Sequence, residues 1–275
     1  MARILFLGDV MGRPGRLALK THLPEILAAF SPDLVIANAE NAAGGAGISP
    51  KPLNELKGLG IDVFTSGNHV WDNREAYPLL EAEPFLLRPA NYPPGVPGRG
   101  VVVRSLGEGG AKTERSELCH GQIGVINLQG RVFMREIDCP FRAADMEIET
   151  LNDSGVKVIL VDFHAEATSE KEAMGRYLDG RVTAVIGTHT HVQTADGRVL
   201  PGGTAYLSDA GMCGPTGGVI GVKAESVVGR FLNALPFRAE PAEGPVALRG
   251  CVVDFDEKTG RALAIETVNR EDDDG

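Results

Sequence analysis

The chain has 275 residues, of which 27 are Lys or Arg and 37 are Asp or Glu, so its formal net charge at pH 7 is −10. A chain of this length can bury one sizeable α/β core or two small ones. The acidic balance argues against broad, sequence-independent binding of DNA or RNA, which needs a basic face. A small anionic substrate remains compatible with it, because a local cationic site can oppose the overall charge.

The sequence pattern shows no membrane or disulfide signature. No apolar run approaches the roughly 18 residues that span a bilayer, and the start, MARILFLGDV, is too short for a signal peptide. The four cysteines, Cys119, Cys139, Cys213 and Cys251, are scattered and form no C-x-x-C pair. We therefore expect a cytoplasmic protein with reduced thiols and no membrane contact.

The first third of the chain alternates short apolar runs with helix-like spacing. The pattern predicts strands over residues 3–10, 33–41 and 61–70, and helices over residues 16–30, 49–60 and 73–83. Ser49 is the expected N-cap of the second helix. Near-continuous apolar strands that alternate with helices are typical of an α/β fold with a largely parallel sheet covered on both faces.

The rest of the chain adds further strands and one predicted hairpin. Residues 91–114, rich in Gly and Pro, predict an edge strand and an exposed turn; further strands are predicted over 121–130, 156–166 and 182–191, with a helix over 171–180. Residues 246–270 predict a hairpin turned at Lys258-Thr259-Gly260, followed by a solvated tail. No repeat or low-complexity linker interrupts the sequence, which favours a single domain over residues 1–275.

Two Gly-rich stretches are too long and loose for tight turns. They are AAGGAGIS after the second predicted strand and AGMCGPTGGVIGV late in the chain. Both fit irregular surface loops and equally fit mobile loops over a site at the strand ends. Residues 42–58 and 211–235 are accordingly candidates for cap elements.

Polar or metal-ligating residues follow nearly every predicted strand. In chain order they are Asp9, Glu40 with Asn41, Asn68 with His69, His164, and finally His189 with His191. In a parallel α/β sheet the carboxyl ends of the strands lie along one edge, where ligands bind. We therefore expect these side chains to converge on one site.

The candidate ligands offer oxygen and nitrogen but no thiolate, a set that suits manganese, iron or zinc. Two histidines at i and i+2 on a strand point to the same side, so His189 and His191 could each serve one metal of a pair about 3.5–4 Å apart. Glu40 is the natural bridging carboxylate. Two divalent ions, two carboxylates and a bridging hydroxide leave a net charge of roughly +1, which attracts phosphate and indicates phosphoester hydrolysis.

Each residue alone also has a purely structural interpretation. An Asp after a strand is often a helix cap, Glu40 and Asn41 could form a turn, and His164 could be a buried histidine with satisfied hydrogen bonds. His69 could simply pack beside Trp71. The ordered occurrence of all of them at strand ends favours the shared site.

The motifs GDV, NAEN, SGNHVWD, DFHAE and GTHTHVQTAD resemble the signature blocks of the calcineurin-like metallophosphoesterases. The resemblance covers nearly the whole chain and is closest to the YmdB-like branch, whose members are described as 2′,3′-cyclic-nucleotide 2′-phosphodiesterases. It implies a four-layer α/β/β/α sandwich with a dinuclear centre, with iron as the first choice of metal and manganese as the alternative.

The resemblance also implies residue roles. Asp9, Glu40, Asn41 and His191 would hold one metal, and Glu40, Asn68, His164 and His189 the other. His69 matches the proton donor to the leaving alcohol. The broader superfamily has Asp-x-His in its first block, where this chain has Asp9-Val10-Met11, and a bridging Asp where this chain has Glu40. The YmdB-like branch shares these departures.

The sequence thus predicts a dinuclear metal-dependent phosphodiesterase that uses a metal-bridging hydroxide on small phosphodiesters such as 2′,3′-cyclic nucleotides. One alternative is a phosphomonoesterase or nucleotidase on the same scaffold. The other is a regulatory protein that binds a nucleotide at the metal site without turnover. The sequence leaves open whether copies of the chain assemble into a homo-oligomer.

Overall fold

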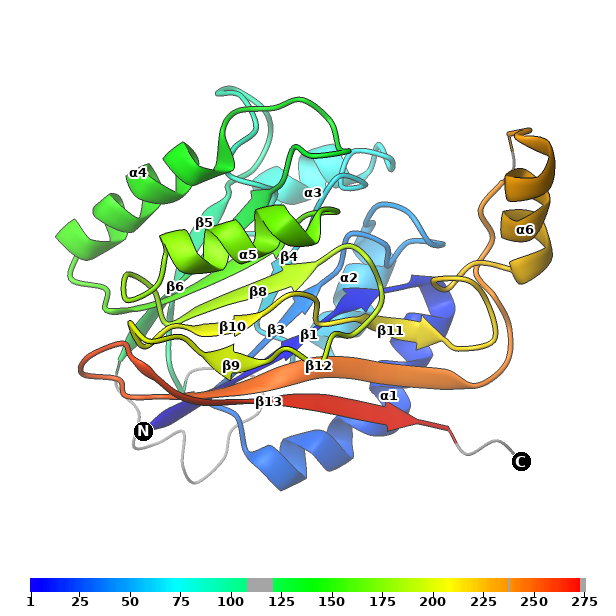
Figure 1. The fold of residues 1–275 in the computed structure, drawn as a ribbon. Coiled ribbons are helices and arrows are strands. Elements are labelled where there is room, and N and C mark those ends of the chain that lie inside the picture. Colours follow the sequence, from blue (N-terminus) through cyan, green and yellow to red (C-terminus); the bar gives the residue numbers. More distant parts are fainter. Residues whose placement is uncertain (108–120, 237, 273–275) are drawn as a thin grey trace.

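The computed structural model describes residues 1–107, 121–236 and 238–272. Within these ranges the chain forms a mixed α/β fold with two sheets (Figure 1). The helices are α1 (Gly12–Phe30), α2 (Pro50–Lys57), α3 (Ala76–Ala82), α4 (Pro140–Asp153), α5 (Thr168–Tyr177) and α6 (Ala224–Asn233). None of the described helices is both long and apolar enough to cross a membrane.

The first sheet has the strand order β2-β11-β12-β1-β3-β4, with β13 pairing β12. Its strands are β1 (Ala2–Leu7), β2 (Asp9–Val10), β3 (Leu34–Asn38), β4 (Val63–Thr65), β11 (Met212–Pro215), β12 (Val246–Phe255) and β13 (Ala262–Glu271). β1, β3 and β4 are parallel, whereas β12 runs antiparallel to β1 and β13. The predicted hairpin is confirmed as β12–β13, and Gly260 in its turn has the left-handed φ of 72° that favours glycine.

The second sheet has the strand order β5-β6-β7-β8-β10-β9. Its strands are β5 (Val101–Ser105), β6 (Gln122–Gln129), β7 (Val158–His164), β8 (Ala184–Thr188), β9 (Arg198–Val199) and β10 (Ala205–Leu207). β6, β7, β8 and β10 are parallel, and β5 is the edge strand expected from the Gly/Pro-rich segment. The largely parallel single sheet expected from the alternation is therefore replaced by two mixed sheets.

Side chains that alternate along the strands face two different apolar clusters. In β1, Ile4 and Phe6 join the cluster that also contains Leu160 and Ile186 of the second sheet, whereas Leu5 and Leu7 join the cluster that contains residues of α1 and α2. A third cluster joins α4 and α5 to the outer face of the second sheet. The central strands β1, β3, β7 and β8 are thus buried on both faces, which explains why they read as continuous apolar runs, whereas β13 is mostly exposed (Figure 1).

Several element boundaries differ from the sequence prediction. The strand expected over 61–70 ends at Thr65, because the Ser66 amide leaves the sheet to donate to Asn127 Oδ1 at 2.9 Å. The strand expected over 3–10 divides at Gly8 into β1 and β2. α4 has no counterpart among the predicted helices, although Pro140 in its first turn is a usable start signal.

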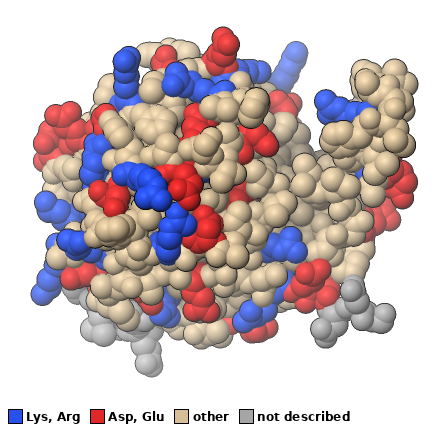
Figure 2. Space-filling view, viewed as in Figure 1, with Lys and Arg blue, Asp and Glu red and all other residues tan. Residues whose placement is uncertain are grey.

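The late Gly-rich segment leads into α6, which stands apart from the main body (Figure 1). Phe231 and Leu232 on this helix are 84% and 83% exposed, and the surface there is mostly uncharged (Figure 2). Cys139, Cys213 and Cys251 are free thiols. Cys119, the predicted turn beyond residue 107 and the end of the tail lie outside the described residues.

Phe6 tests the packing between the sheets, because its ring is fully buried in the cluster that joins them. Phe6→Ala should lower the free energy of unfolding by about 3–5 kcal/mol, since it removes apolar contacts and leaves a cavity. Urea denaturation followed by circular dichroism measures this change. Phe231→Ala, which removes an exposed ring, is the matched control and should leave the unfolding midpoint nearly unchanged; equal effects of the two substitutions would contradict this account of the core.

Candidate metal centre

The predicted site residues come together where the ends of the two sheets meet. Asp9 opens β2, Glu40 and Asn41 follow β3, and Asn68 and His69 lie in the turn after β4, so these five belong to the first sheet. The second sheet supplies the other three: His164 ends β7, and His189 and His191 follow β8. We expected all of these side chains at one edge of a single sheet. That expectation is wrong, because two sheets contribute residues to the site.

Three other ligand-type atoms converge at the Nε2 atom of His164. Asn68 Oδ1 and His189 Nδ1 each lie 3.0 Å from it, and Glu40 Oε1 lies 3.2 Å away. A ring nitrogen carries either one hydrogen or one lone pair, so hydrogen bonding alone satisfies only one of these partners. Glu40 and His164, which are buried, and His189, which is partly exposed, together have the composition and spacing of a metal-binding group.

A second group adjoins the first through Glu40. Asn41 Nδ2 lies 3.1 Å from Glu40 Oε1 and 3.3 Å from His191 Nε2, and His191 Nε2 lies 3.9 Å from Asp9 Oδ1. Among the described residues, the buried atoms Asp9 Oδ1 and Asn41 Oδ1 have no hydrogen-bond donor. Buried oxygens without a donor are costly unless a cation satisfies them, so these residues fit a metal ion.

His189 and His191 each turn one ring nitrogen toward this site and bind another group with the opposite nitrogen. His191 Nδ1 lies 2.8 Å from the carbonyl oxygen of Ile220, and His189 Nε2 lies 3.0 Å from Glu166 Oε2. Both outer partners are acceptors, so each outer nitrogen carries the hydrogen. The inner nitrogens, His191 Nε2 and His189 Nδ1, then present lone pairs, as metal-binding histidines do.

His164 is oriented by a two-step hydrogen-bond chain. Its Nδ1 atom lies 2.9 Å from Thr188 Oγ1, which donates to Asp162 Oδ1 at 2.7 Å. The Thr188 hydroxyl has one hydrogen, and once this is given to the carboxylate the oxygen accepts from His164 Nδ1–H. Burial raises the pKa of Asp162 to about 7, a rise that the charge of His164 opposes. In the neutral ring, this hydrogen-bond chain places the hydrogen of His164 on Nδ1, so the lone pair of Nε2 faces the site.

The electrostatics of the metal-free site favour a positive charge at its centre. Burial disfavours the charged form of His164, but Glu40 and Asp9 outweigh it and raise the pKa of the imidazole to about 9. Burial alone would raise the pKa of Glu40, yet the charge of His164 brings it down to about 2. Burial, reinforced by His164, lowers the pKa of His189 to about 3. In the metal-free site the carboxylates of Glu40 and Asp9 thus favour a proton on His164, and a bound metal cation would take the place of that proton.

The backbone of the loop after β8 is strained at two positions. His189 and His191 have φ values of 104° and 64°, in the left-handed region that non-glycine residues rarely adopt. The strand ends at Thr188, so the expected pleat does not orient the two rings. Asp209 accepts from the amide and hydroxyl of Thr190, at 3.0 and 2.8 Å. Lys171, itself buried, pairs with Asp209 at 2.7 Å and holds it in place.

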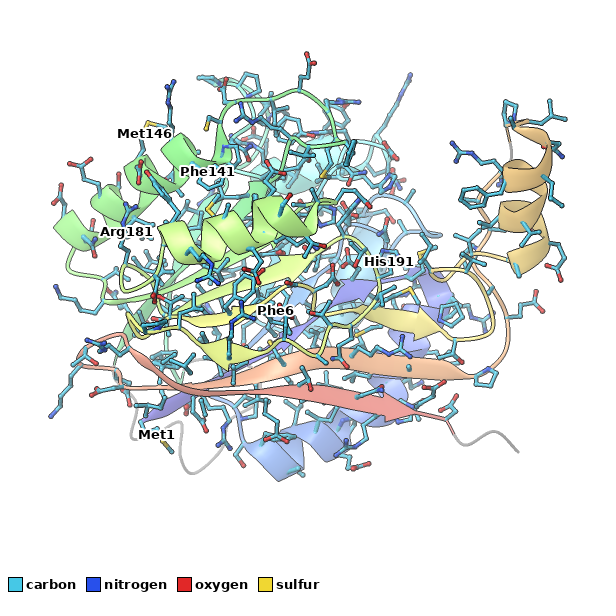
Figure 3. All side chains as sticks on the ribbon, viewed as in Figure 1. Met1, Phe6, Phe141, Met146, Arg181 and His191 are labelled. Atoms are coloured by element: carbon cyan, nitrogen blue, oxygen red, sulfur yellow. The ribbon has the colours of Figure 1, made fainter. Side chains whose placement is uncertain are left out.

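His69 lies at the mouth of the site, with 41% of its side chain exposed. Its amide donates to Glu40 Oε2 at 3.1 Å, and its Nδ1 atom lies 2.7 Å from Asp72 Oδ2. The packing alternative is not what the structure shows, because the ring contacts of Trp71 are with Tyr77 and Tyr92. A cavity of about 380 Å³ opens here, lined among others by Glu40, His69, His189 and His191, and Figure 3 shows His191 on the side of the body that faces α6.

Gly67 explains how the Asn68 turn approaches so closely. A Cβ atom at this position would lie 2.1 Å from Cδ2 of His164, so only glycine allows the imidazole to stand against the turn. The glycine of the G-N-H motif is therefore required by packing.

Sequence reasoning missed the groups that support the ligands. Asp162 is a charged residue inside an apolar strand, two positions before His164, and that placement was a usable signal. Thr188, Glu166, Asp72 and the Lys171–Asp209 pair carried no comparable signal, because their partners lie on other segments.

The YmdB-like protein family model matches residues 5–268 of this chain. The chain belongs to the YmdB-like family. The resemblance inferred from the motifs is thereby confirmed. A relative from Bacillus subtilis, named 2′,3′-cyclic-nucleotide 2′-phosphodiesterase, is 45% identical over 98% of both chains. A relative from Mycoplasma pneumoniae, named putative phosphatase/phosphodiesterase, is 34% identical over 99% of this chain and 94% of its own.

Solved structures agree with the fold. The crystal structure of a hypothetical protein from Thermus thermophilus has a TM-score of 0.88 and 41% identity, covering 98% of this chain and 100% of that one. A 5′-nucleotidase precursor from the same organism has a TM-score of 0.57 at 16% identity over 98% of this chain and 54% of its own. This second likeness shows the fold alone: the chain shares the two-sheet α/β architecture of that structure.

Thr188 tests the orientation of His164. Thr188→Val keeps the shape of the side chain but removes the hydroxyl that links His164 to Asp162. We expect the affinity for Mn²⁺ to fall about 10- to 100-fold, the usual cost of losing an outer partner of a metal-binding histidine. Calorimetric titration of metal-stripped protein measures it, with folding checked by circular dichroism. Thr188→Ser keeps the hydroxyl and should bind like wild type; equal affinity of the Val variant would rule out the hydrogen-bond chain.

Proposed function

We propose that the chain is a dinuclear metal-dependent phosphodiesterase acting on small phosphodiesters, with 2′,3′-cyclic nucleotides as the first substrate class to test. One observation carries the proposal: three imidazoles turn their free nitrogens toward Glu40 and two amides at the junction of the sheets, while other groups bind the opposite ring nitrogens. The name of the Bacillus subtilis relative supports the substrate class.

The ligand sets follow the two groups of contacts. One ion is assigned to Asp9, Glu40, Asn41 and His191, and the other to Glu40, Asn68, His164 and His189. Iron is the first candidate and manganese the second, since imidazole with carboxylate and amide oxygen suits both. When bound, two such ions supply Lewis-acid activation of the phosphate and of the attacking water.

His69 is assigned as the general acid. In its protonated form the ring donates Nδ1–H to Asp72 and has Nε2–H available to the cavity that His69 lines. The Nε2 proton passes to the departing alkoxide oxygen, and the ring remains in the Nδ1–H tautomer held by Asp72. The amide contact to Glu40 fixes this donor beside the metal ligands.

The finer architecture belongs to the same proposal. The three apolar clusters support a four-layer α/β/β/α sandwich of the calcineurin-like type in a single domain over residues 1–275. Ile220 and Val222 line the cavity, which supports a cap formed by the late Gly-rich segment, and Gly45 and Ala46 give the same support for the early one. The cytoplasm is the proposed location.

A phosphomonoesterase on the same scaffold is the second candidate, because the Mycoplasma pneumoniae relative is named for both activities. Metal-replete protein should hydrolyse phosphodiesters faster than the corresponding monoesters when the two are assayed side by side. The reverse preference would favour the second candidate.

His164 tests the ligand assignment. His164→Ala should lower the metal content and reduce hydrolysis of bis-p-nitrophenyl phosphate by about 100-fold or more, because it removes a metal ligand. Metal analysis by mass spectrometry and a colorimetric assay measure the two effects. His22→Ala is the matched control, since the His22 ring hydrogen-bonds Asp272 and lines neither of the cavities at the site. Unchanged hydrolysis by His164→Ala with metal retained would refute the proposal.

His69 tests the proton transfer separately from metal binding. His69→Ala should keep its metal but lose about 10²- to 10⁴-fold in kcat on adenosine 2′,3′-cyclic phosphate, whose alkoxide needs a proton to leave. On bis-p-nitrophenyl phosphate, whose phenolate leaves without one, the loss should be much smaller. Equal losses on both substrates would remove His69 from the role of acid.

A further inference from the structure

A second cavity, of about 350 Å³, extends from the metal centre to a turn that no motif singled out. Its lining includes Asn68, His69 and His189 on one side and Phe133 and Arg135 on the other. Whatever binds at the metals can therefore reach this turn.

Phe133 is placed in a way that the fold itself does not explain. Its ring is 89% exposed and belongs to none of the apolar clusters formed by the described residues. Its backbone has a φ of 62°, in the left-handed region that is unfavourable for a bulky residue. An aromatic residue that is both strained and exposed at the rim of a cavity points to a ligand contact.

The turn that carries Phe133 is held firmly. The Glu170 carboxylate, only 8% exposed, accepts from the amides of Arg131 and Val132 at 3.0 to 3.2 Å. The turn is also tied to the metal centre, because Gly130 N–H donates to the carbonyl oxygen of His164 at 2.9 Å. The ring therefore stands on a preformed platform whose position is coupled to that of a metal ligand.

Arg135 contributes a positive charge to the same cavity. Its guanidinium is exposed and has no hydrogen bond or ion pair in the described part of the chain. Asp72 is the carboxylate that lines the same cavity, and its hydrogen bond is to His69 rather than to Arg135. A free guanidinium beside a metal centre is suited to an anionic phosphodiester.

We propose that Phe133 is a specificity-determining residue: its ring stacks on the nucleobase of a substrate whose phosphate lies at the metal centre, while Arg135 binds the charge of that phosphate. This inference rests on the proposed function. Every nucleobase offers a π face, so the platform selects for a base without selecting one base in particular.

The test compares substrates with and without a base. For metal-replete Phe133→Ala, KM for adenosine 2′,3′-cyclic phosphate should rise about 5- to 150-fold, the range for loss of one base–aromatic stack, with little change in kcat. For ribose 2′,3′-cyclic phosphate, which lacks the base, KM should not change. Phe133→Trp should restore the low KM for the nucleotide, and Arg135→Gln should raise KM for both substrates.

Val132→Ala is the matched control, because this neighbour is also exposed but does not line the cavity; it should behave like wild type. Equal effects of Phe133→Ala on both substrates, or no effect on either, would overturn the stacking role.

Calorimetric binding of adenosine 3′-monophosphate, the product left when the P–O2′ bond of the cyclic phosphate breaks, to the metal-replete protein separates the two proposals. If the protein shows no turnover but Phe133→Ala binds the nucleotide more weakly than wild type, the phosphodiesterase proposal is refuted and the stacking role of Phe133 is supported. Turnover with unaltered nucleotide binding would refute the platform and support the phosphodiesterase.

Discussion

Two carboxylates, two amides and three imidazoles are confined to a largely buried corner where the ends of the two sheets meet, and their charges do not balance without a cation. Asp9 Oδ1 and Asn41 Oδ1 have no donor in the described chain, and His164 Nε2 is approached by three partners when it can satisfy one. In the metal-free state a proton on His164 supplies part of the missing charge. The remaining features of the site are arranged around this requirement for positive charge.

The two-sheet architecture makes such a concentration of polar groups tolerable. Apolar clusters bury both faces of the central strands, and the polar groups that form the site gather where these strands end. Neighbouring groups hold the three imidazoles: Thr188 with Asp162 for His164, Glu166 for His189, and the Ile220 carbonyl for His191. One nitrogen of each ring is thus held by a neighbouring group, which fixes the direction of the nitrogen that faces the site.

Strained backbone is concentrated around the same corner. His189 and His191 adopt left-handed conformations that bring both rings inward, and the buried Lys171–Asp209 pair holds the loop between them. Phe133 also has a left-handed backbone conformation. It lines the cavity beside the site, in a turn that Glu170 holds through hydrogen bonds to backbone amides. In each case a buried carboxylate binds backbone amides and stabilises a conformation that the local sequence would not adopt alone.

The amino-acid sequence by itself determined the α/β class, most elements, the family and the residues that meet at the site, because continuous apolar runs and the motifs at their ends are local signals. It did not predict the roles of four residues at the site, because these roles arise from contacts with distant segments: Asp162, Thr188, Glu166 and Phe133. Only the tertiary structure decided that two sheets share the site, that strained backbone rather than a strand pleat orients His189 and His191, and that an aromatic ring stands at the rim. The physical reason is that side-chain direction and hydrogen-bond partners depend on packing between segments, which no periodicity within one segment encodes.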